Sequence, residues 1–439
     1  MLEFDDIQHI LLTRTPAITG RYEFLTFDTP AGGRAWLSEL IDRVQSATAA
    51  RDTMDESDRW ITLAFTWNGL RALGVPEDSL ATFPDEFREG MTSRASILGD
   101  TGPNAPEHWV GGLAGDDVHA IAILFSRTDE QNALSIAAHD DLLARTDGVR
   151  SLSFLDLNAT PPFNYAHDHF GFRDRLSQPV MKGSGEEPTP GSGAALEPGE
   201  FILGYPDEDG SVANLPQPDV LSRNGSYMAY RRLEEHVAVF RDYLRENSET
   251  LDDEELLAAK FMGRWRSGAP LVLAPDGDDP ELGADPMRNN DFNYKDDDPF
   301  GYACPLGSHA RRLNPRDTAH NMNRRRMIRR GATYGPALPE GQPDDGVDRG
   351  IAAFIICANL LRQFEFAQNV WINDKTFHEL GNEHDPICGT QDGALDFTVP
   401  KRPIRRVHKG IPAFTTLKGG AYFFLPGISA MRYLLTLGD

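Results

Sequence analysis

The chain has 439 residues and carries 43 basic and 67 acidic side chains, so its formal net charge at pH 7 is −24. Hydrophobic residues make up 40% and charged residues 25%, which is typical of a globular protein and excludes a fibrous or disordered chain. An acidic chain of this kind is a poor ligand for nucleic acids or anionic membranes, because both need clustered Lys and Arg. We therefore expect neither nucleic acid nor a membrane among its partners.

The sequence also bears on where the protein works. Its longest apolar run, at 351–361, is shorter than the roughly 20 residues that a membrane helix needs. The acidic start, Met-Leu-Glu-Phe-Asp-Asp, lacks the basic and apolar regions of a secretory signal. Cys304, Cys357 and Cys388 are too widely spaced for a disulfide framework or a Cys-rich zinc module. We expect a cytoplasmic protein without a membrane span.

In the first half of the chain, helical and strand patterns alternate. Apolar side chains recur every three or four residues over 33–47, which predicts an amphipathic helix. A segment rich in Gly, Pro, Ser and Glu at 181–198 predicts a surface loop. The remaining predictions for this half are strands at 61–67, 119–125 and 200–205, and a helix at 135–144.

The second half repeats this mixture of elements. An acidic stretch at 276–298, rich in Asp, Asn and Pro, predicts an exposed loop. Two similar halves, with a boundary within 205–225, indicate an α+β fold with helices on one face of a mostly antiparallel sheet. The other predictions are helices at 234–245 and 254–265, a buried strand at 352–360 leading into a helix, a strand at 420–425 and a helix at 429–435.

Two segments concentrate reactive side chains. The first is Asp-His-Phe-Gly-Phe-Arg-Asp-Arg-Leu-Ser-Gln-Pro at 168–179, and the second is 304–317, which the Arg-rich segment 324–330 follows. His309 in the second segment lacks the neighbouring His or Cys of a zinc site, and no phosphate-binding P-loop is present. One imidazole opposite an acid and an Arg suits a haem peroxidase, although the residue types alone leave several chemistries open.

Residues 170–179 resemble the signature stretch of the dye-decolorising peroxidases, whose pattern is Gly-x-x-Asp-Gly. Residues 304–317 resemble that family's proximal haem-ligand segment, and residues 327–335 resemble its distal Arg segment. The resemblance covers nearly the whole chain in family order. Further similar stretches are found at 64–76, 199–205, 363–374 and 395–400.

The resemblance implies two ferredoxin-like domains, each an antiparallel β-sheet with helices on one face, of the dimeric α+β barrel type. Residues 1–215 would form the N-terminal domain, and residues 216–439 the haem-binding domain. It also implies a peroxidase that carries haem b, reduces hydrogen peroxide and oxidises dyes, phenolics or other small one-electron donors. Bulky donors would not reach a buried haem, so Trp371 and Tyr334 are candidates for relaying electrons. Assembly into homo-oligomers is left open.

The same resemblance implies roles for individual residues. His309 would be the axial ligand of the haem iron, and Asp396 the carboxylate that accepts a hydrogen bond from the other ring nitrogen. Asp174 would be the base that moves a proton between the oxygens of hydrogen peroxide, and Arg329 the cation that stabilises the departing oxygen. Arg175 stands where the family has Gly, and would instead pair with a haem propionate or line the distal entrance.

Other interpretations stay open for these residues. His309, Asp174 and Asp396 also suit ordinary turns or strand ends, and Arg329 competes with its neighbours in the Arg-rich segment 324–330. The departure from the motif after Asp174 keeps open a haem-binding or haem-transfer protein with little peroxidase turnover. A haem-free relative of the family is a third interpretation.

Overall fold

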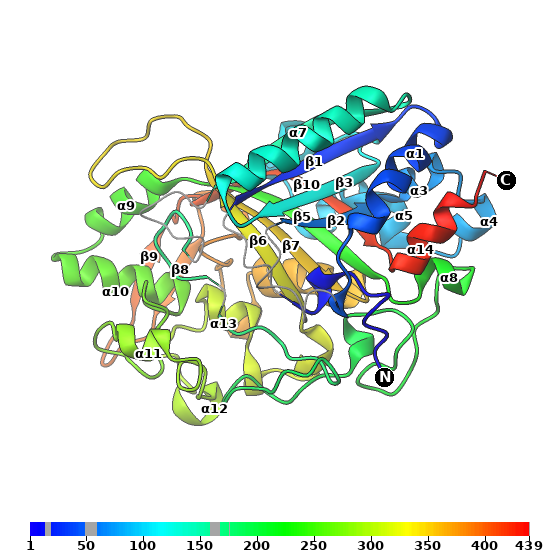
Figure 1. Cartoon of the computed structure of the whole chain (residues 1–439). Coiled ribbons are helices and arrows are strands. Elements are labelled where there is room, and N and C mark those ends of the chain that lie inside the picture. Colours follow the sequence, from blue (N-terminus) through cyan, green and yellow to red (C-terminus); the bar gives the residue numbers. More distant parts are fainter. Residues whose placement is uncertain (14–18, 49–58, 159–166, 175, 439) are drawn as a thin grey trace.

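The computed structural model describes residues 1–439 except 14–18, 49–58, 159–166, 175 and 439 (Figure 1). Eight strands form one antiparallel sheet in the order β4-β1-β3-β2-β10-β5-β7-β6, and a separate hairpin pairs β8 with β9. The strands are β1 Thr19–Phe27, β2 Arg59–Phe65, β3 Ala120–Ser126, β4 Val149–Asn158, β5 Ser226–Glu235, β6 Ile328–Tyr334, β7 Gly350–Cys357, β8 Asp396–Val399, β9 Arg406–Lys409 and β10 Thr415–Leu425.

The sheet contains the same arrangement twice. When the sheet strands of each half are counted in chain order, without the separate β8–β9 hairpin, β4-β1-β3-β2 and β10-β5-β7-β6 both follow the order 4-1-3-2. This repeat confirms the expectation of two ferredoxin-like α+β halves. The halves meet at β2 and β10, where Phe65 is aligned with Phe424, so one continuous sheet stands in place of two separate ones. The division at residues 215 and 216, between β4 and β5, stays a proposal.

One hydrophobic core lies between the two halves. Side chains of a strand alternate between the faces of its sheet, and the inward side chains of both halves meet. The ring centroids of Tyr22 in β1 and Phe354 in β7 are 4.7 Å apart, and those of Phe24 and Tyr230 are 5.3 Å apart. All four belong to a single cluster of buried side chains. The halves therefore share one core.

Strand β7 separates this core from a cavity on the other face of the sheet. Phe354 and Ile356 are fully buried in the core. The side chains of Ile351, Ala353 and Ile355, which alternate with the core residues along the strand, line the cavity instead. The period of two along a strand thus gives β7 one face for folding and one for a ligand.

Most helices lie on the outer faces of the sheet, as α7 does along β1 and β3 (Figure 1). Helix α10 is capped at its start by Thr250, whose side chain accepts the N–H of Asp253, and at its end by Gly263, whose φ is +93°. In the described part of the chain, no helix is both long and apolar enough to cross a membrane. The helices are α1 Pro30–Leu40, α3 Trp67–Ala72, α4 Glu77–Leu80, α5 Asp85–Ser93, α6 Ala95–Leu98, α7 Asp129–Arg145, α8 Asp219–Ser222, α9 Val237–Glu246, α10 Leu251–Met262, α11 Pro280–Ala284, α12 Tyr294–Asp297, α13 His309–Leu313 and α14 Ile428–Leu435.

Three predicted elements differ from the structure. Residues 200–205 form turns and no strand, because the backbone N–H groups of Phe201 and Ile202 both donate to the carbonyl of Pro198 within a local turn. The predicted acidic loop at 276–298 contains the short helices α11 and α12. The helix after β7 is π-helical, over Leu360–Glu365 and Ala367–Ile372.

Candidate active site

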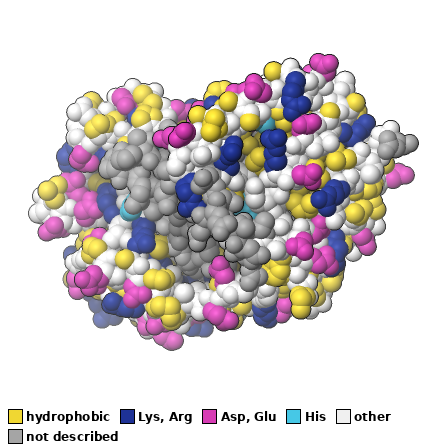
Figure 2. Space-filling model, viewed as in Figure 1, with side chains coloured by type: hydrophobic (Ala, Val, Ile, Leu, Met, Phe, Trp, Pro, Cys, Tyr) yellow, Lys and Arg dark blue, Asp and Glu magenta, His cyan; other side chains and the backbone are white. Residues whose placement is uncertain are grey.

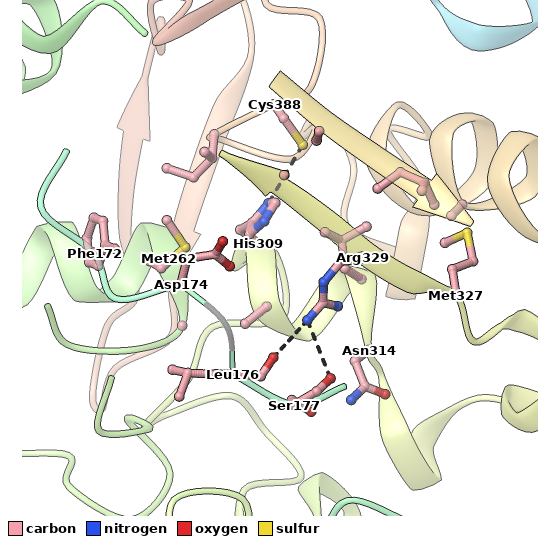
Figure 3. Close-up of a pocket in the computed structure, with 18 of the residues that line it drawn as sticks. Phe172, Asp174, Leu176, Ser177, Met262, His309, Asn314, Met327, Arg329 and Cys388 are labelled. Atoms are coloured by element: carbon pink, nitrogen blue, oxygen red, sulfur yellow. Dashed lines mark hydrogen bonds between the residues drawn. The ribbon is translucent and has the colours of Figure 1, made fainter. Parts of the chain in front are cut away.

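A cavity of about 350 Å³ lies against the face of β5, β6 and β7 that points away from the core. Alternate side chains of β7 give it an apolar wall. Asp174, His309 and Arg329, which are far apart in the sequence, all line it (Figure 3). The fold therefore brings three of the predicted site residues to one cavity.

His309 is the first residue of α13. The preceding Ser308 is buried, and its Oγ donates a hydrogen bond to the carbonyl of Lys260 in α10 at 2.5 Å, which fixes where α13 begins. His309 Nδ1 lies 2.9 Å from Oδ2 of Asp385 and 3.1 Å from its Oδ1. Because the carboxylate occupies Nδ1, Nε2 is the ring nitrogen available to a ligand in the cavity.

The carboxylate beside this imidazole belongs to Asp385, so the prediction that Asp396 fills this place is wrong. Asp385 is fully buried, and its Oδ1 accepts the backbone N–H groups of Ile387 at 2.9 Å and Cys388 at 3.0 Å. Asp396 begins β8, where the strand register places it opposite Lys409. Its Oδ2 lies 3.5 Å from the Nζ of that lysine, so its side chain forms an ion pair within the hairpin.

Two opposing effects act on the pKa of Asp385. Burial alone would raise it, because the ionised form loses its water. The facing His309 imidazole, its hydrogen bond and the backbone N–H of Cys388 outweigh burial, so the pKa of Asp385 lies below its ordinary value. Asp385 is therefore an ionised acceptor that holds the imidazole proton on Nδ1.

Arg329 lies on β6, and its guanidinium points at the segment that follows Asp174 (Figure 3). Its Nη2 donates to the carbonyl of Leu176 at 2.8 Å and to that of Ser177 at 3.4 Å, and its backbone N–H donates to Oε1 of Gln178 at 3.1 Å. Burial lowers the pKa of Arg329, and the charge of Asp174 opposes this effect. These bonds tie the segment that carries Asp174 to β6.

The sequence analysis also assigned roles to Arg175, at the haem edge, and to Trp371 and Tyr334, in electron transfer. Arg175 lies outside the described residues, so its role stays a prediction. Trp371 and Tyr334, the candidates for passing electrons to the surface, are only 4% and 2% exposed. Neither of them can therefore contact a bulky donor in solution directly.

Three more arginines of the cavity, Arg264, Arg316 and Arg326, have no carboxylate partner among the described residues. They donate to backbone carbonyls and to Asn side chains, as where Oδ1 of Asn290 accepts from Arg264 at 2.7 Å and from Arg316 at 3.1 Å. Burial lowers the pKa of Arg264 and Arg326 to about 10. Positive charge that is largely withdrawn from water and lacks a counter-charge favours an anionic ligand.

Two buried acids also line the cavity, Asp168 at 7% exposure and Glu235 at 5%. Oδ1 of Asp168 accepts the N–H of Phe172 at 2.7 Å, and Oε2 of Glu235 accepts the N–H of His169 at 3.0 Å. Burial raises the pKa of Asp168 to about 7 and that of Glu235 well above its ordinary value, and the charges of neighbouring acids add to both shifts. These acids thus add less negative charge to the cavity than their number suggests.

Comparison of the sequence with known proteins agrees with the fold and with the residues of the cavity. The model of the "DyP dimeric alpha+beta barrel domain" matches residues 8–145. A dye-decolorizing peroxidase of Mycena epipterygia is 30% identical over 98% of this chain and 86% of its own length. The multifunctional dye peroxidase DyP2 of an Amycolatopsis species is also 30% identical, over 94% of this chain and 91% of its own length.

Solved structures agree with the sequences. The DyP-type peroxidase of Auricularia auricula-judae is 27% identical, with a TM-score of 0.88 over 99% of this chain and all of its own. An ancestral D-type dye-decolorizing peroxidase is 28% identical, with a TM-score of 0.88 over 99% of both chains. The chain therefore belongs to the dye-decolorising peroxidase family and is a haem-dependent peroxidase.

Proposed function

We propose that haem b binds in this cavity with His309 as the axial ligand of its iron, and that Asp174 and Arg329 act on hydrogen peroxide. The observation that carries the proposal is the 2.9 Å contact between His309 Nδ1 and Asp385, in a cavity that Arg329 also lines. An imidazole that ligates a metal usually donates its other ring N–H to such a carboxylate, which fixes the ring and raises its basicity.

The residues present fit a haem. The His309 imidazole supplies one strong nitrogen ligand, and the apolar wall of β7 suits the face of a porphyrin. Haem b also carries two propionates, which would balance buried guanidinium charge through charge-assisted hydrogen bonds. We propose Arg264, Arg316 and Arg326 as the residues that hold these propionates.

Bound haem supplies the redox-active iron that takes two oxidising equivalents from peroxide. Asp174 accepts a proton from one oxygen of hydrogen peroxide and returns it to the other, so that the departing oxygen leaves as water. Arg329 stabilises the negative charge that grows on the departing oxygen while the O–O bond breaks. Asp385 keeps the proton of His309 on Nδ1, so that Nε2 faces the cavity as a ligand.

For the reducing substrate, we propose dyes and substituted phenols. One solved dye-decolorizing peroxidase, 28% identical over the whole of this chain with a TM-score of 0.86, is a complex with 2,6-dimethoxyphenol. The same compound is therefore a suitable first donor for this chain. We also propose a cytoplasmic location, because Cys304, Cys357 and Cys388 are all free thiols, and cell fractionation tests it.

Haem titration and dye oxidation test the proposal together. We expect one equivalent of haem b to give a Soret band, and the loaded protein to oxidise an anthraquinone dye and 2,6-dimethoxyphenol only when hydrogen peroxide is added. Replacing the exposed His108 by Ala, a control outside the cavity, should change neither result. Haem that binds without peroxide-dependent oxidation would favour a haem-binding or haem-transfer protein, and a chain that takes up no haem would contradict the proposal altogether.

A further inference from the structure

The side chain of Gln178 bonds the backbone of Arg329. Its Oε1 accepts the backbone N–H of Arg329 at 3.1 Å, and both residues line the cavity. Strand β6, which carries Arg329, is the last strand in the order of the sheet, and within the described residues it pairs only with β7. Gln178 therefore supplies, from a loop, an acceptor for a backbone N–H at the edge of the sheet.

The guanidinium of Arg329 uses only one of its nitrogens to contact this loop. Its Nη2 donates to the carbonyls of Leu176 and Ser177, at 2.8 Å and 3.4 Å (Figure 3). A guanidinium has five N–H donors, and Nε and Nη1 of Arg329 form no hydrogen bond with a described residue. These donors are available to a ligand in the cavity.

The backbone of the loop has an unusual conformation at Ser177. Its φ is +56°, in the left-handed region that residues other than Gly rarely adopt. Such a conformation persists where the surrounding contacts hold it, and it is found preferentially at functional sites. Here the carbonyls on either side of this φ, those of Leu176 and Ser177, both accept from Arg329, and Gln178 bonds the end of the turn to β6.

We propose that Gln178 is a positioning residue, whose amide oxygen fixes the backbone of Arg329 and thereby directs the free N–H groups of its guanidinium at a ligand in the cavity. Without this bond, the two carbonyls would be the only acceptors that tie Arg329 to the loop, so the guanidinium would move with them. A preorganised cation stabilises charge because it need not reorient during the reaction. A displacement of about 1 Å can cost about 10²-fold in rate.

This inference rests on the proposed role of Arg329, and fluoride binding to the ferric, haem-loaded protein tests it. Bound fluoride is an anion that accepts hydrogen bonds from a nearby guanidinium, so its affinity, read from the absorption spectrum, reports the placement of Arg329 without turnover. Gln178→Met keeps the length of the side chain but lacks the amide oxygen. We expect it to weaken fluoride binding about tenfold and to slow the reaction with peroxide by about tenfold or more, in both cases less than Arg329→Leu does. Gln342→Met, at an exposed position outside the cavity, should change neither.

A double substitution separates positioning from a general loss of structure. In an Arg329→Leu background, Gln178→Met should change neither the fluoride affinity nor the rate further, because the group that Gln178 positions is gone. A collapse of the segment that carries Asp174 would instead slow the reaction in both backgrounds. Gln178→Ala removes the same acceptor and carries the same expectations if Gln178→Met takes up too little haem for the titration.

The outcomes distinguish this inference from the proposed function. Wild-type fluoride affinity and rate in Gln178→Met, or equal losses with and without Arg329, would overturn the inference and leave the proposed function intact. Failure of both Gln178 variants to take up haem would show that this residue maintains the cavity itself, and would overturn the inference as well. Wild-type values in Arg329→Leu would overturn the assignment of Arg329 and the inference with it.

Discussion

At the scale of single residues, Asp174 and Arg329 are proposed to act on the same step of peroxide cleavage. Loss of a general base typically costs about 10²–10⁴-fold, and loss of one charge stabiliser about 10²–10³-fold. We expect Arg329→Leu to slow the reaction with peroxide at least as much as Asp174→Asn, and the double variant to be slower by less than the product of the two factors. Rapid mixing with hydrogen peroxide measures these rates.

Arg330 provides the matched control for this prediction. It neighbours Arg329 on β6 and also lines the cavity, but its Nε donates to the carbonyl of Ile10 at 3.0 Å, whereas Arg329 donates to the segment that follows Asp174. Arg330→Leu should therefore retain a rate close to that of the wild type. If Arg330→Leu is the slower variant, or if both distal variants react at the wild-type rate, the assignment of Arg329 is incorrect.

Asp168 should make the folded protein less stable as the pH rises. Its pKa is about 7 in the folded protein, against about 3.9 for an Asp in an unfolded chain. Between these values the folded state binds more protons, so the free energy of unfolding falls by up to about 1.4 kcal/mol per pH unit. Asp168→Asn, whose Oδ1 can still accept the Phe172 N–H, should reduce this slope, to which the buried Glu235 also contributes. Denaturant titrations of both proteins at about pH 5 and about pH 7 measure it, and equal slopes would refute the prediction.

The residues that the sequence predicted least well are those whose partners are distant in the chain. The segments around Asp174, His309 and Arg329 resemble family motifs, and all three side chains line the cavity. Asp385 lies in an irregular loop, Asn-Glu-His-Asp-Pro, and only the fold brings it to the imidazole. Asp396 resembled the family position, but the register of β8 places it opposite Lys409, with which its side chain forms an ion pair.

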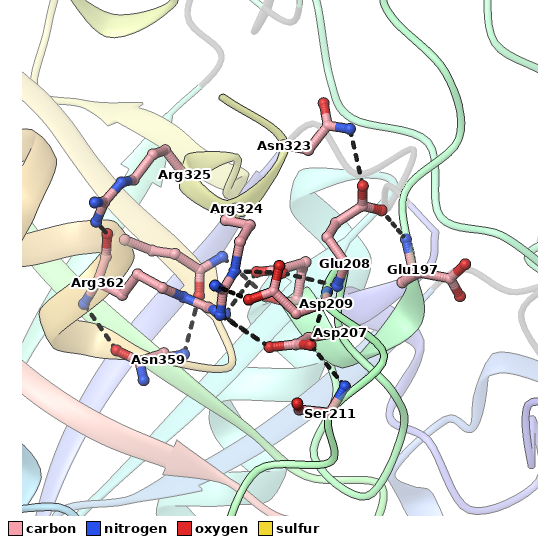
Figure 4. Close-up of polar contacts among 12 residues, drawn as sticks. Glu197, Asp207, Glu208, Asp209, Ser211, Asn323, Arg324, Arg325, Asn359 and Arg362 are labelled. Atoms are coloured by element: carbon pink, nitrogen blue, oxygen red, sulfur yellow. Dashed lines mark hydrogen bonds and ion pairs between the residues drawn. The ribbon is translucent and has the colours of Figure 1, made fainter. Parts of the chain in front are cut away.

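At the scale of elements, a network of ion pairs ties the turn segment around residues 197–211 to the helical turn Met322–Arg325, which precedes β6, and to the first π-helix (Figure 4). Glu200 is fully buried and accepts Nη2 of Arg362 at 2.7 Å, with Nε of Arg324 at 3.7 Å. Asp209 pairs with Arg324 at the exposed edge of the network. The network explains how a segment without a strand keeps a fixed place beside Arg325, which lines the cavity.

Buried and exposed members of this network should differ in their effect on stability. Glu200→Gln removes the buried partner of Arg362, which keeps only its pair with Asp207 at 3.2 Å, so we expect a loss of about 1–3 kcal/mol in the free energy of unfolding. Asp209→Asn breaks a pair whose acid is 55% exposed, and should cost less than about 1 kcal/mol. Chemical denaturation compares the two variants. Similar losses in both would show that burial does not determine the strength of the network.

Element types were predicted from the sequence better than their bounds and partners. The helices near 33–47 and 254–265 have clear periodic patterns and appear as α1 and α10 with shifted ends. The apolar run at 201–203 has no such pattern, and its burial comes from packing against the core and not from pairing in a sheet. The strand order 4-1-3-2 depends on contacts between distant segments, which local patterns do not contain.

At the scale of the whole molecule, charge is distributed unevenly. The chain has a net charge of −24, yet the cavity contains half-buried arginines that pair with no carboxylate of the described residues. Acidic and basic side chains are interspersed on the face drawn in Figure 2. Long-range repulsion should therefore act on anionic donors as they approach, whereas the cavity itself favours anionic groups.

The salt dependence of dye oxidation tests this distribution of charge. At neutral pH, oxidation of an anionic dye should become faster as salt is raised to about 0.15 M, because the Debye length falls to about 8 Å and screens the repulsion. A neutral phenol such as 2,6-dimethoxyphenol serves as the control, and its rate should stay constant. A rate for the anionic dye that falls with salt would mean that local positive charge dominates its approach.

The central claim is that the imidazole of His309 holds the haem iron, and rescue by free imidazole tests it most directly. His309→Gly creates space in the cavity where the ring stood and leaves Asp385 in place. The account predicts that this variant binds haem weakly with an altered Soret band, and that added imidazole restores both the band and peroxide-dependent dye oxidation. A His309→Gly variant with the affinity and spectrum of the wild type in the absence of imidazole would contradict the claim.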